Sequence, residues 1–192
     1  MKFSPSASPR ITTERLVLKL LEPHNAALMA DFRLKNRHHL TQWEPLRPPQ
    51  FYTEAFWQVQ LRLAIRDFRS GNSVCLSILD EEESQVLGVC NYTNIIRGTF
   101  EACHLGYALG DDKQGKGIMF EALNASTRFI FDEFKLHRIM ANYLPRNKRS
   151  GDLLKRLGFE IEGEAKQFLK INGVWEDHVL TSLLEPRART KS

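Results

Sequence analysis

The stretch that most constrains the fold is residues 104–131, in which an apolar run, a glycine-rich loop and an amphipathic segment follow one another. Residues 105–109 alternate large apolar and small side chains, as a strand does. The loop at 110–117 contains three glycines, so regular structure is expected to stop there. Apolar residues then recur at helical spacing. Because a loop that ends at a helix start leaves backbone N–H groups unpaired beside the positive end of the helix dipole, this stretch predicts an anion site.

Known phosphate-binding loops have glycines at similar spacing, and individual residues discriminate among them. A nucleoside-triphosphate loop needs a Ser or Thr after its lysine to hold magnesium, whereas Gly117 follows Lys116 here. A dinucleotide-binding loop needs a third glycine for close packing of helix on strand, and Phe120 stands at that position. The pattern therefore argues against an ATPase or GTPase and against a Rossmann dehydrogenase.

Residues 112–117, DKQGKG, resemble the pyrophosphate loop of the GNAT superfamily of N-acetyltransferases. That pattern has Gln or Arg, two further residues, Gly, one further residue, and Gly or Ala. Gly115 and Gly117 match it, whereas Asp112 stands at the Gln or Arg position. The departure leaves the chemistry possible, because the resemblance implies that main-chain amides bind the diphosphate of acetyl-CoA.

A wider resemblance covers about residues 10–184. The segments TTERLVLKLLEP at 12–23, WEP at 43–45 and HRIMANYLPRNKRSGDLLKRLGFEIEG at 137–163 are similar to the ribosomal-protein-alanine N-acetyltransferase branch of the superfamily, the RimJ type. The run NKRSGDLLKRLGF is far more specific than the glycine loop. This resemblance implies acetyl transfer from acetyl-CoA to the N-terminal alanine of the fifth protein of the small ribosomal subunit.

The element order predicts an α/β fold (α+β in some schemes), with helices on both faces of a mixed, mostly antiparallel central sheet of about seven strands. This is the acetyltransferase (GNAT) fold. One N-acetyltransferase domain is expected at 11–184, between loose tails at 1–10 and 185–192. The proline-rich segment 36–52 breaks all periodicity and is expected to be irregular.

Three local signals predict where elements begin and turn. Thr53 and Asn147 each precede an amphipathic segment and are expected to cap a helix at its N-terminus. The pair Asn172–Gly173 predicts the turn of a C-terminal hairpin at 165–184.

Composition limits the partners and the compartment. The net charge of +4 over 192 residues permits an anionic ligand, but no dense basic stripe suggests sequence-specific nucleic-acid binding. The three cysteines form no C-x-x-C pair, which is typical of free thiols in a cytoplasmic protein. No stretch approaches membrane-spanning length, and no His/Cys pattern predicts a metal site. We therefore expect a cytoplasmic enzyme without a metal, with possible contacts to the ribosome or its assembly intermediates.

The resemblance implies a specific set of cofactor contacts. The pantetheine arm would pair with the strand edge at Tyr107, Ala108 and Leu109, with Asn147 bonding its amides and Ser150 near the sulfur as general acid. Each has a structural alternative, since Asn147 also suits a helix cap, Ser150 a first helical turn and Tyr107 a strand core. The diphosphate would meet the main chain of Gln114, Gly115, Lys116, Gly117, Ile118 and Met119.

The general base and the acceptor site rest on weaker patterns. Glu101 and His104 are candidate bases because their strand faces the acetyl group, with Asp177 and His178 as alternates, although a strand histidine often has no catalytic role. The acceptor groove is expected between segment 36–52 and the C-terminal hairpin. There the aromatic ring of Trp43 and the carboxylate of Glu44 suit an α-ammonium group; alternatively, Trp43 only anchors its loop.

Two other functions stay open at this stage. A GNAT enzyme acting on another protein N-terminus or on a small amine would share the same cofactor loop. A non-enzymatic RNA- or ribosome-binding module could use the basic residues at 146–156 instead, although this segment lacks the interleaved aromatic residues that stack on bases.

Overall fold

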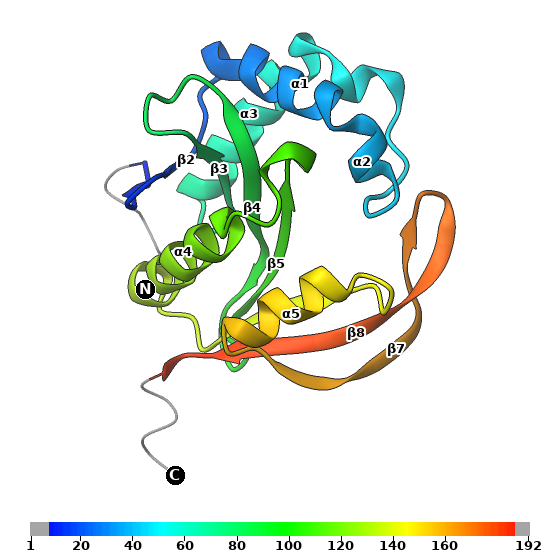
Figure 1. Cartoon of the computed structure of the whole chain (residues 1–192). Coiled ribbons are helices and arrows are strands. Elements are labelled where there is room, and N and C mark those ends of the chain that lie inside the picture. The colour runs from blue at the N-terminus through cyan, green and yellow to red at the C-terminus, as the bar shows by residue number, and fades with distance from the viewer. Residues whose placement is uncertain (1–7, 187–192) are drawn as a thin grey trace.

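A computed structural model describes residues 8–186 and contains an eight-stranded sheet with the strand order β1-β2-β3-β4-β5-β6-β8-β7 (Figure 1). Every neighbouring pair is antiparallel except β5 and β6, which are parallel. The strands are β1 (Arg10–Thr12), β2 (Val17–Lys19), β3 (Val74–Leu79), β4 (Val86–Ile96), β5 (Ala102–Leu109), β6 (Arg138–Tyr143), β7 (Glu160–Ile171) and β8 (Val174–Leu184).

Helices cover both faces of this sheet, as the sequence predicts. Helix α4 packs on the face that carries Cys90, Tyr92 and Leu105, whereas α1 packs on the opposite face against Val86 and Val89. The α-helices are α1 (Ala26–Lys35), α2 (Arg37–Thr41), α3 (Glu54–Arg69), α4 (Ile118–Phe134) and α5 (Lys148–Arg156). Short 3-10 helices lie at Pro23–Asn25, Pro49–Tyr52 and Asp111–Lys113. None of the helices in the described part of the chain is long and apolar enough to cross a membrane.

The sheet has one strand more than expected, and the extra strand is β1. It pairs with β2 through Arg10↔Lys19 after a tight turn, in which the N–H of Thr13 bonds the carbonyl of Leu16 at 2.9 Å. The strand forms because Ile11 packs against the main core. Regular structure therefore begins at Arg10, within the predicted tail; residues 1–7 and 187–192 lie outside the described part.

Segment 36–52 is more ordered than its prolines suggest. It forms α2 and the 3-10 turn at Pro49–Tyr52, because Leu40 and Phe51 are both buried. Sequence reasoning missed these elements, since each is too short to show a hydrophobic period.

The predicted caps and hairpin turn are confirmed. The hydroxyl of Thr53 accepts the N–H of Phe56 at 3.3 Å, and the side chain of Asn147 accepts the N–H of Ser150 at 3.2 Å. Asn172 and Gly173 join β7 to β8 with φ of 44° and 84°. The hairpin is longer than predicted, since β7 begins at Glu160.

The parallel pair β5–β6 separates along its length. The two strands pair only at Ala102↔Arg138, Cys103↔Ile139 and His104↔Met140. Beyond His104, β5 runs on to Leu109 with β4 on one side and no strand of the described chain on the other. The pair is parallel because the chain crosses over from β5 to β6 through α4. The separation leaves a gap in the sheet beyond His104.

Candidate active site

A cavity of about 740 Å³ occupies the opening between β5 and α5. Its walls come from segments far apart in the sequence: α2 and the residues after it, the end of β5, the glycine loop, the start of α4 and the first turns of α5. The cavity brings together most residues predicted for cofactor and acceptor binding, namely Trp43, Glu44, Tyr107, Ala108, Leu109, Gln114, Gly115, Gly117, Ile118, Met119, Asn147 and Ser150.

The glycine loop presents its main chain to this cavity. Gly115 and Gly117 have φ of 72° and 76°, the left-handed region, and Gly117 is the N-cap of α4. A Cβ on Gly115 would meet no atom within 4 Å, so the backbone conformation, not crowding, requires glycine there. Within residues 8–186, the N–H groups of residues 115–120 bond no main-chain acceptor. Six consecutive free donors at a helix N-terminus are the arrangement that binds a phosphate group.

The side chain of Lys116 is not part of the cavity wall. Its ammonium group donates a hydrogen bond to the carbonyl of Asp112 at 2.8 Å, within the same loop. Lys116 therefore contributes only its main chain to the candidate site.

Gln114 links three elements at the mouth of the cavity. Its amide nitrogen lies 2.7 Å from Nε2 of His39 in α2 and 3.1 Å from Oδ1 of Asp111, and its amide oxygen accepts a hydrogen bond from Arg149 in α5. The sequence pattern predicted only a main-chain role for Gln114. It missed this bridge because His39 and Arg149 lie far away in the sequence.

Tyr107 and Ser150 meet inside the cavity. Their hydroxyl oxygens are 2.7 Å apart, and Ser150 is positioned by the cap that Asn147 forms with its N–H. Burial raises the pKa of Tyr107 to about 12, against the opposing effect of the hydrogen bond with Ser150, so the phenol carries its proton at neutral pH. Gly151 permits this approach of α5, because a Cβ there would lie 2.9 Å from the ring of Tyr143. The two hydroxyl groups therefore form a hydrogen-bonded pair that can donate a proton inside the cavity.

Segment 36–52 contacts the tip of the C-terminal hairpin directly. The N–H of Asn172 at the hairpin tip bonds the carbonyl of Glu44 at 2.9 Å. Arg146 lies over the ring of Trp43 at 5.5 Å and pairs with Glu176 at 2.9 Å. Trp43 is thus held in place as a wall of the cavity.

The carboxylate of Glu44 is already engaged. One oxygen is 2.8 Å from Nη1 of Arg33, and the other is 3.5 Å from Nε of Arg47. Arg33 is only 6% exposed, and burial lowers the pKa of its guanidinium while Glu44 opposes that shift. Glu44 therefore serves as the counter-ion of a buried arginine rather than as a free carboxylate for an ammonium group.

A second cavity of about 810 Å³ lies on the α1–α3 side of the sheet. His104 lines it together with Asn91 and Thr93, and Nδ1 of His104 is buried without a hydrogen-bond partner in the described chain. Burial lowers the pKa of this imidazole, which is consequently neutral at pH 7. Since His104 is the last β5 residue paired with β6, it lies at the apex of the gap in the sheet.

Comparison with known proteins is consistent with this geometry. Residues 15–160 match the family model described as an acetyltransferase (GNAT) domain. The chain belongs to the GNAT acetyltransferase family. It is 48% identical over 177 residues to the Escherichia coli (strain K12) [ribosomal protein uS5]-alanine N-acetyltransferase, covering 92% of this chain and 91% of that protein.

Solved structures show the same GNAT fold. The ribosomal-protein-S5-alanine acetyltransferase of Vibrio fischeri superposes with a TM-score of 0.89 at 39% identity, over 93% of this chain and 97% of that one. RimJ of Mycobacterium smegmatis, solved in complex with CoA-disulfide, gives a TM-score of 0.84 at 24% identity, over 94% and 88% of the two chains. The protein is an acetyltransferase with the predicted mixed-sheet architecture.

In this GNAT domain the other predicted base, Glu101, lies away from both large cavities. Its carboxylate accepts hydrogen bonds from Arg97 and from the N–H of Gly98, each at 3.0 Å, and its carbonyl accepts the N–H of His137 at 2.7 Å. With φ of 41°, Glu101 is a turn residue between β4 and β5. The expectation that Glu101 lies in the same strand as His104 is wrong, because β5 begins at Ala102, after this turn.

The alternate bases are also engaged elsewhere. Asp177 pairs with Lys166 and accepts the N–H of Gln167, each at 2.9 Å, and His178 is buried on β8. Neither residue lines a large cavity. Of the four candidate bases only His104 lines one of the two large cavities, and it lines the second one, not the cavity that contains Tyr107 and Ser150.

A covalent route through cysteine is disfavoured by the same structure. Cys90 and Cys103 are buried, and burial raises the pKa of each thiol to about 12, so neither forms a thiolate at neutral pH. Among residues 8–186, no group of three or more His, Cys, Asp or Glu side chains is arranged to hold a metal ion.

Proposed function

We propose that the protein transfers the acetyl group of acetyl-CoA to the N-terminal alanine amine of ribosomal protein uS5, by direct attack within a ternary complex. The observation that carries the cofactor assignment is the row of free N–H groups at 115–120, at a cavity that is also lined by the end of β5 beyond its pairing with β6. The identity of 48% to a uS5-alanine N-acetyltransferase supports the acceptor. This acceptor places the reaction in the cytoplasm, where ribosomes assemble.

The shape of the cavity suits an extended cofactor. The diphosphate would bind the amides of the loop, where the helix dipole favours negative charge. The pantetheine arm would then follow the free edge of β5 at Tyr107–Leu109 as an added strand. This path ends at Ser150, next to the opening in the sheet.

The reaction needs a neutral amine, a stabilised oxyanion and a proton for the departing thiolate. The amine nitrogen attacks the thioester carbonyl, and a main-chain N–H at Ala108 or Leu109 stabilises the oxyanion. The C–S bond breaks as Ser150 donates its proton to the sulfur. Ser150 recovers a proton from solvent, relayed through Tyr107, whose hydroxyl oxygen lies 2.7 Å away, and the proton taken from the amine is released to solvent.

On the acceptor side, His104 is the proposed base. An N-terminal amine has a pKa near 8, so only a modest base is needed. The neutral imidazole has a free Nδ1, which can accept the proton that the attacking nitrogen releases. Trp43 is the proposed wall beside the acceptor residue, while Glu44 acts indirectly by holding Arg33.

Mass spectrometry of peptide acetylation tests this function. An Ala-starting peptide with the uS5 N-terminal sequence is expected to gain one acetyl group, whereas the same peptide with a blocked N-terminus is not. A lysine peptide and spermine serve as competing acceptors, and faster acetylation of either would overturn the acceptor assignment. Calorimetry with acetyl-CoA, ATP and RNA separately tests the cofactor: RNA binding without acetyl-CoA binding would favour the ribosome-binding module.

A further inference from the structure

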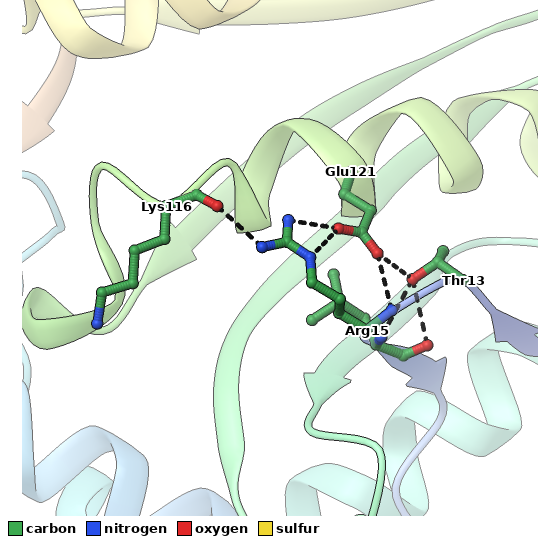
Figure 2. Close-up of polar contacts among 5 residues, drawn as sticks. Thr13, Arg15, Lys116 and Glu121 are labelled. Carbon is green, nitrogen blue, oxygen red and sulfur yellow. Dashed lines mark hydrogen bonds and ion pairs between the residues drawn. The ribbon is translucent and has the colours of Figure 1, made fainter.

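Arg15, Glu121 and Thr13 form a hydrogen-bonded, charged network, called the brace below. It connects the glycine loop at 110–117 to the β1–β2 hairpin, called the N-terminal ribbon. Arg15, in the turn between β1 and β2, donates from Nε and Nη2 to Oε2 of Glu121 at 2.8 Å and 2.6 Å (Figure 2). Its Nη1 donates to the carbonyl of Lys116 at 3.1 Å. One guanidinium group thus holds both the first turn of α4 and the loop that precedes it.

Glu121 is held in turn from two other directions. Its Oε1 accepts the hydroxyl of Thr13 at 2.6 Å and the N–H of Arg15 at 3.1 Å (Figure 2). Burial opposes ionisation, but the hydrogen bonds from Thr13 and Arg15 outweigh it and lower the pKa of this carboxyl. The carboxylate therefore stays charged at neutral pH and keeps the guanidinium in one orientation.

The contact with Lys116 matters because of where that carbonyl lies. It belongs to the peptide unit between Lys116 and Gly117, and the C=O and N–H of a trans peptide point in opposite directions. When Arg15 holds the carbonyl on the outer side of the loop, the N–H of Gly117 is turned the other way, toward the cavity. Glycines on both sides of Lys116 leave this unit otherwise free to rotate.

We propose that Arg15 is a positioning residue for the diphosphate of the cofactor: supported by Glu121 and Thr13, it fixes the loop amides in their binding orientation before the cofactor arrives. This inference rests on the proposed acetyl-CoA site and adds a residue that does not line the cavity. Pre-set donors spare the ordering cost that a mobile glycine loop would otherwise incur on binding.

A purely structural role makes a different prediction. If the brace only tied the ribbon to α4, its loss would lower thermal stability and affect every ligand alike. The side chain of Arg15 is 49% exposed, so the ion pair by itself contributes little to stability. A positioning role instead predicts a loss confined to ligands that carry the diphosphate.

The test compares Arg15→Met, Arg15→Lys and Arg10→Gln in the full chain. Arg10 is the matched control, because it lies in the same ribbon and pairs with Glu83 but contacts no part of the loop. Calorimetry measures CoA affinity, and steady-state kinetics compare acetyl-CoA with S-acetyl-pantetheine, which lacks the diphosphate. Melting temperatures confirm that each variant folds.

Arg15→Met is expected to raise the Kd for CoA about tenfold, because one loop N–H is no longer held toward the diphosphate. A factor of about ten corresponds to the loss of one hydrogen bond. Its kcat at saturating acetyl-CoA and its kcat/KM with S-acetyl-pantetheine stay at the wild-type value. Arg15→Lys keeps a cation beside Glu121 but cannot form the forked contact, so affinity is not restored. Arg10→Gln binds CoA as the wild type does.

Wild-type CoA affinity in Arg15→Met overturns the proposal, as does an equal loss with both acetyl donors. Failure of the wild-type protein to bind CoA would instead refute the proposed function. Restored affinity in Arg15→Lys would show that charge alone acts, without orientation of the carbonyl, and would also contradict the proposal.

Discussion

The two sides of the cavity are built on different principles. The loop at 115–118 binds with main-chain amides that are neighbours in the sequence, and its glycines exist to permit that backbone path. The opposite rim consists of side chains from α2, the residues after it and α5, such as His39, Trp43 and Arg149, which meet only in the folded chain.

The two sides of the cavity are therefore expected to respond differently to substitution. A main-chain site cannot be altered by exchanging one functional group, so only a change of backbone conformation destroys it. A rim of side chains can lose one member while its neighbours and water replace the lost contact. We therefore expect large effects from substitutions in the loop, intermediate effects inside the cleft and small effects at the rim.

The largest effect is expected for Gly117→Val. A β-branched residue at φ of 76° is strained, and its Cβ would lie 3.6 Å from Nη2 of Arg15, so the loop would be forced out of the backbone path that presents its amides. The affinity for CoA should fall by at least about 100-fold, measured by calorimetry. Gly98→Val is the matched control, since Gly98 has φ of 84° in the β4–β5 turn and lines neither large cavity. Equal CoA affinity in the two variants would show that the loop does not bind the cofactor.

Ser150→Ala should reduce kcat rather than binding. Without its hydroxyl the thiolate has no positioned proton donor, and general-acid catalysis is typically worth about 100-fold or more. The Kd for CoA should stay unchanged, because the N–H that Asn147 caps is retained. Single-turnover rates with acetyl-CoA and the Ala-starting peptide measure the effect. A lower CoA affinity with normal kcat would assign Ser150 to cofactor binding instead.

His104→Gln should change the pH profile. Because burial lowers the pKa of His104, the wild-type base is neutral above its ordinary pKa of about 6.5 and is lost only as pH falls below that range. The ratio of wild-type to variant kcat/KM should therefore be constant above pH 6.5, at about tenfold, and decline at lower pH. Taking the ratio cancels the titration of the acceptor amine. A ratio of one at every pH would exclude His104 as the base.

The smallest effect is expected for Gln114→Ala at the rim. The substitution removes the bridge between His39 and Arg149 but leaves the main-chain N–H groups in place. CoA affinity should change by less than about threefold, the range of one exposed hydrogen bond. A loss as large as that of Gly117→Val would mean that the rim, not the loop, holds the cofactor.

Local patterns were sufficient for several parts of the fold. The caps at Thr53 and Asn147, the hairpin turn at Asn172 and the strand–loop–helix order at 104–131 depend on neighbouring residues, so they are visible in the sequence. The strand β1 was missed because three residues carry too little periodicity. Its formation depends on pairing with β2.

The candidate catalytic residues show the same limit of local sequence patterns. Glu101 and His104 were both predicted as candidate bases because their strand was expected to face the acetyl group. The structure separates them, since a turn at Glu101 fixes its carboxylate on Arg97 while His104 reaches the apex of the sheet opening. Glu44 likewise looked like a free acidic group until the fold placed Arg33 beside it.

The order of residues alone determined where the chain bends, which faces are apolar and where main-chain amides are left free at a helix start, because these follow from steric limits and hydrophobic spacing within a few residues. Only the tertiary structure decided which distant groups meet: Tyr107 with Ser150, His39 with Gln114, and Arg15 with Glu121. Such meetings depend on strand register, on the α4 crossover and on the packing of the helices. Each of these is settled by the burial of the whole core rather than by any local pattern.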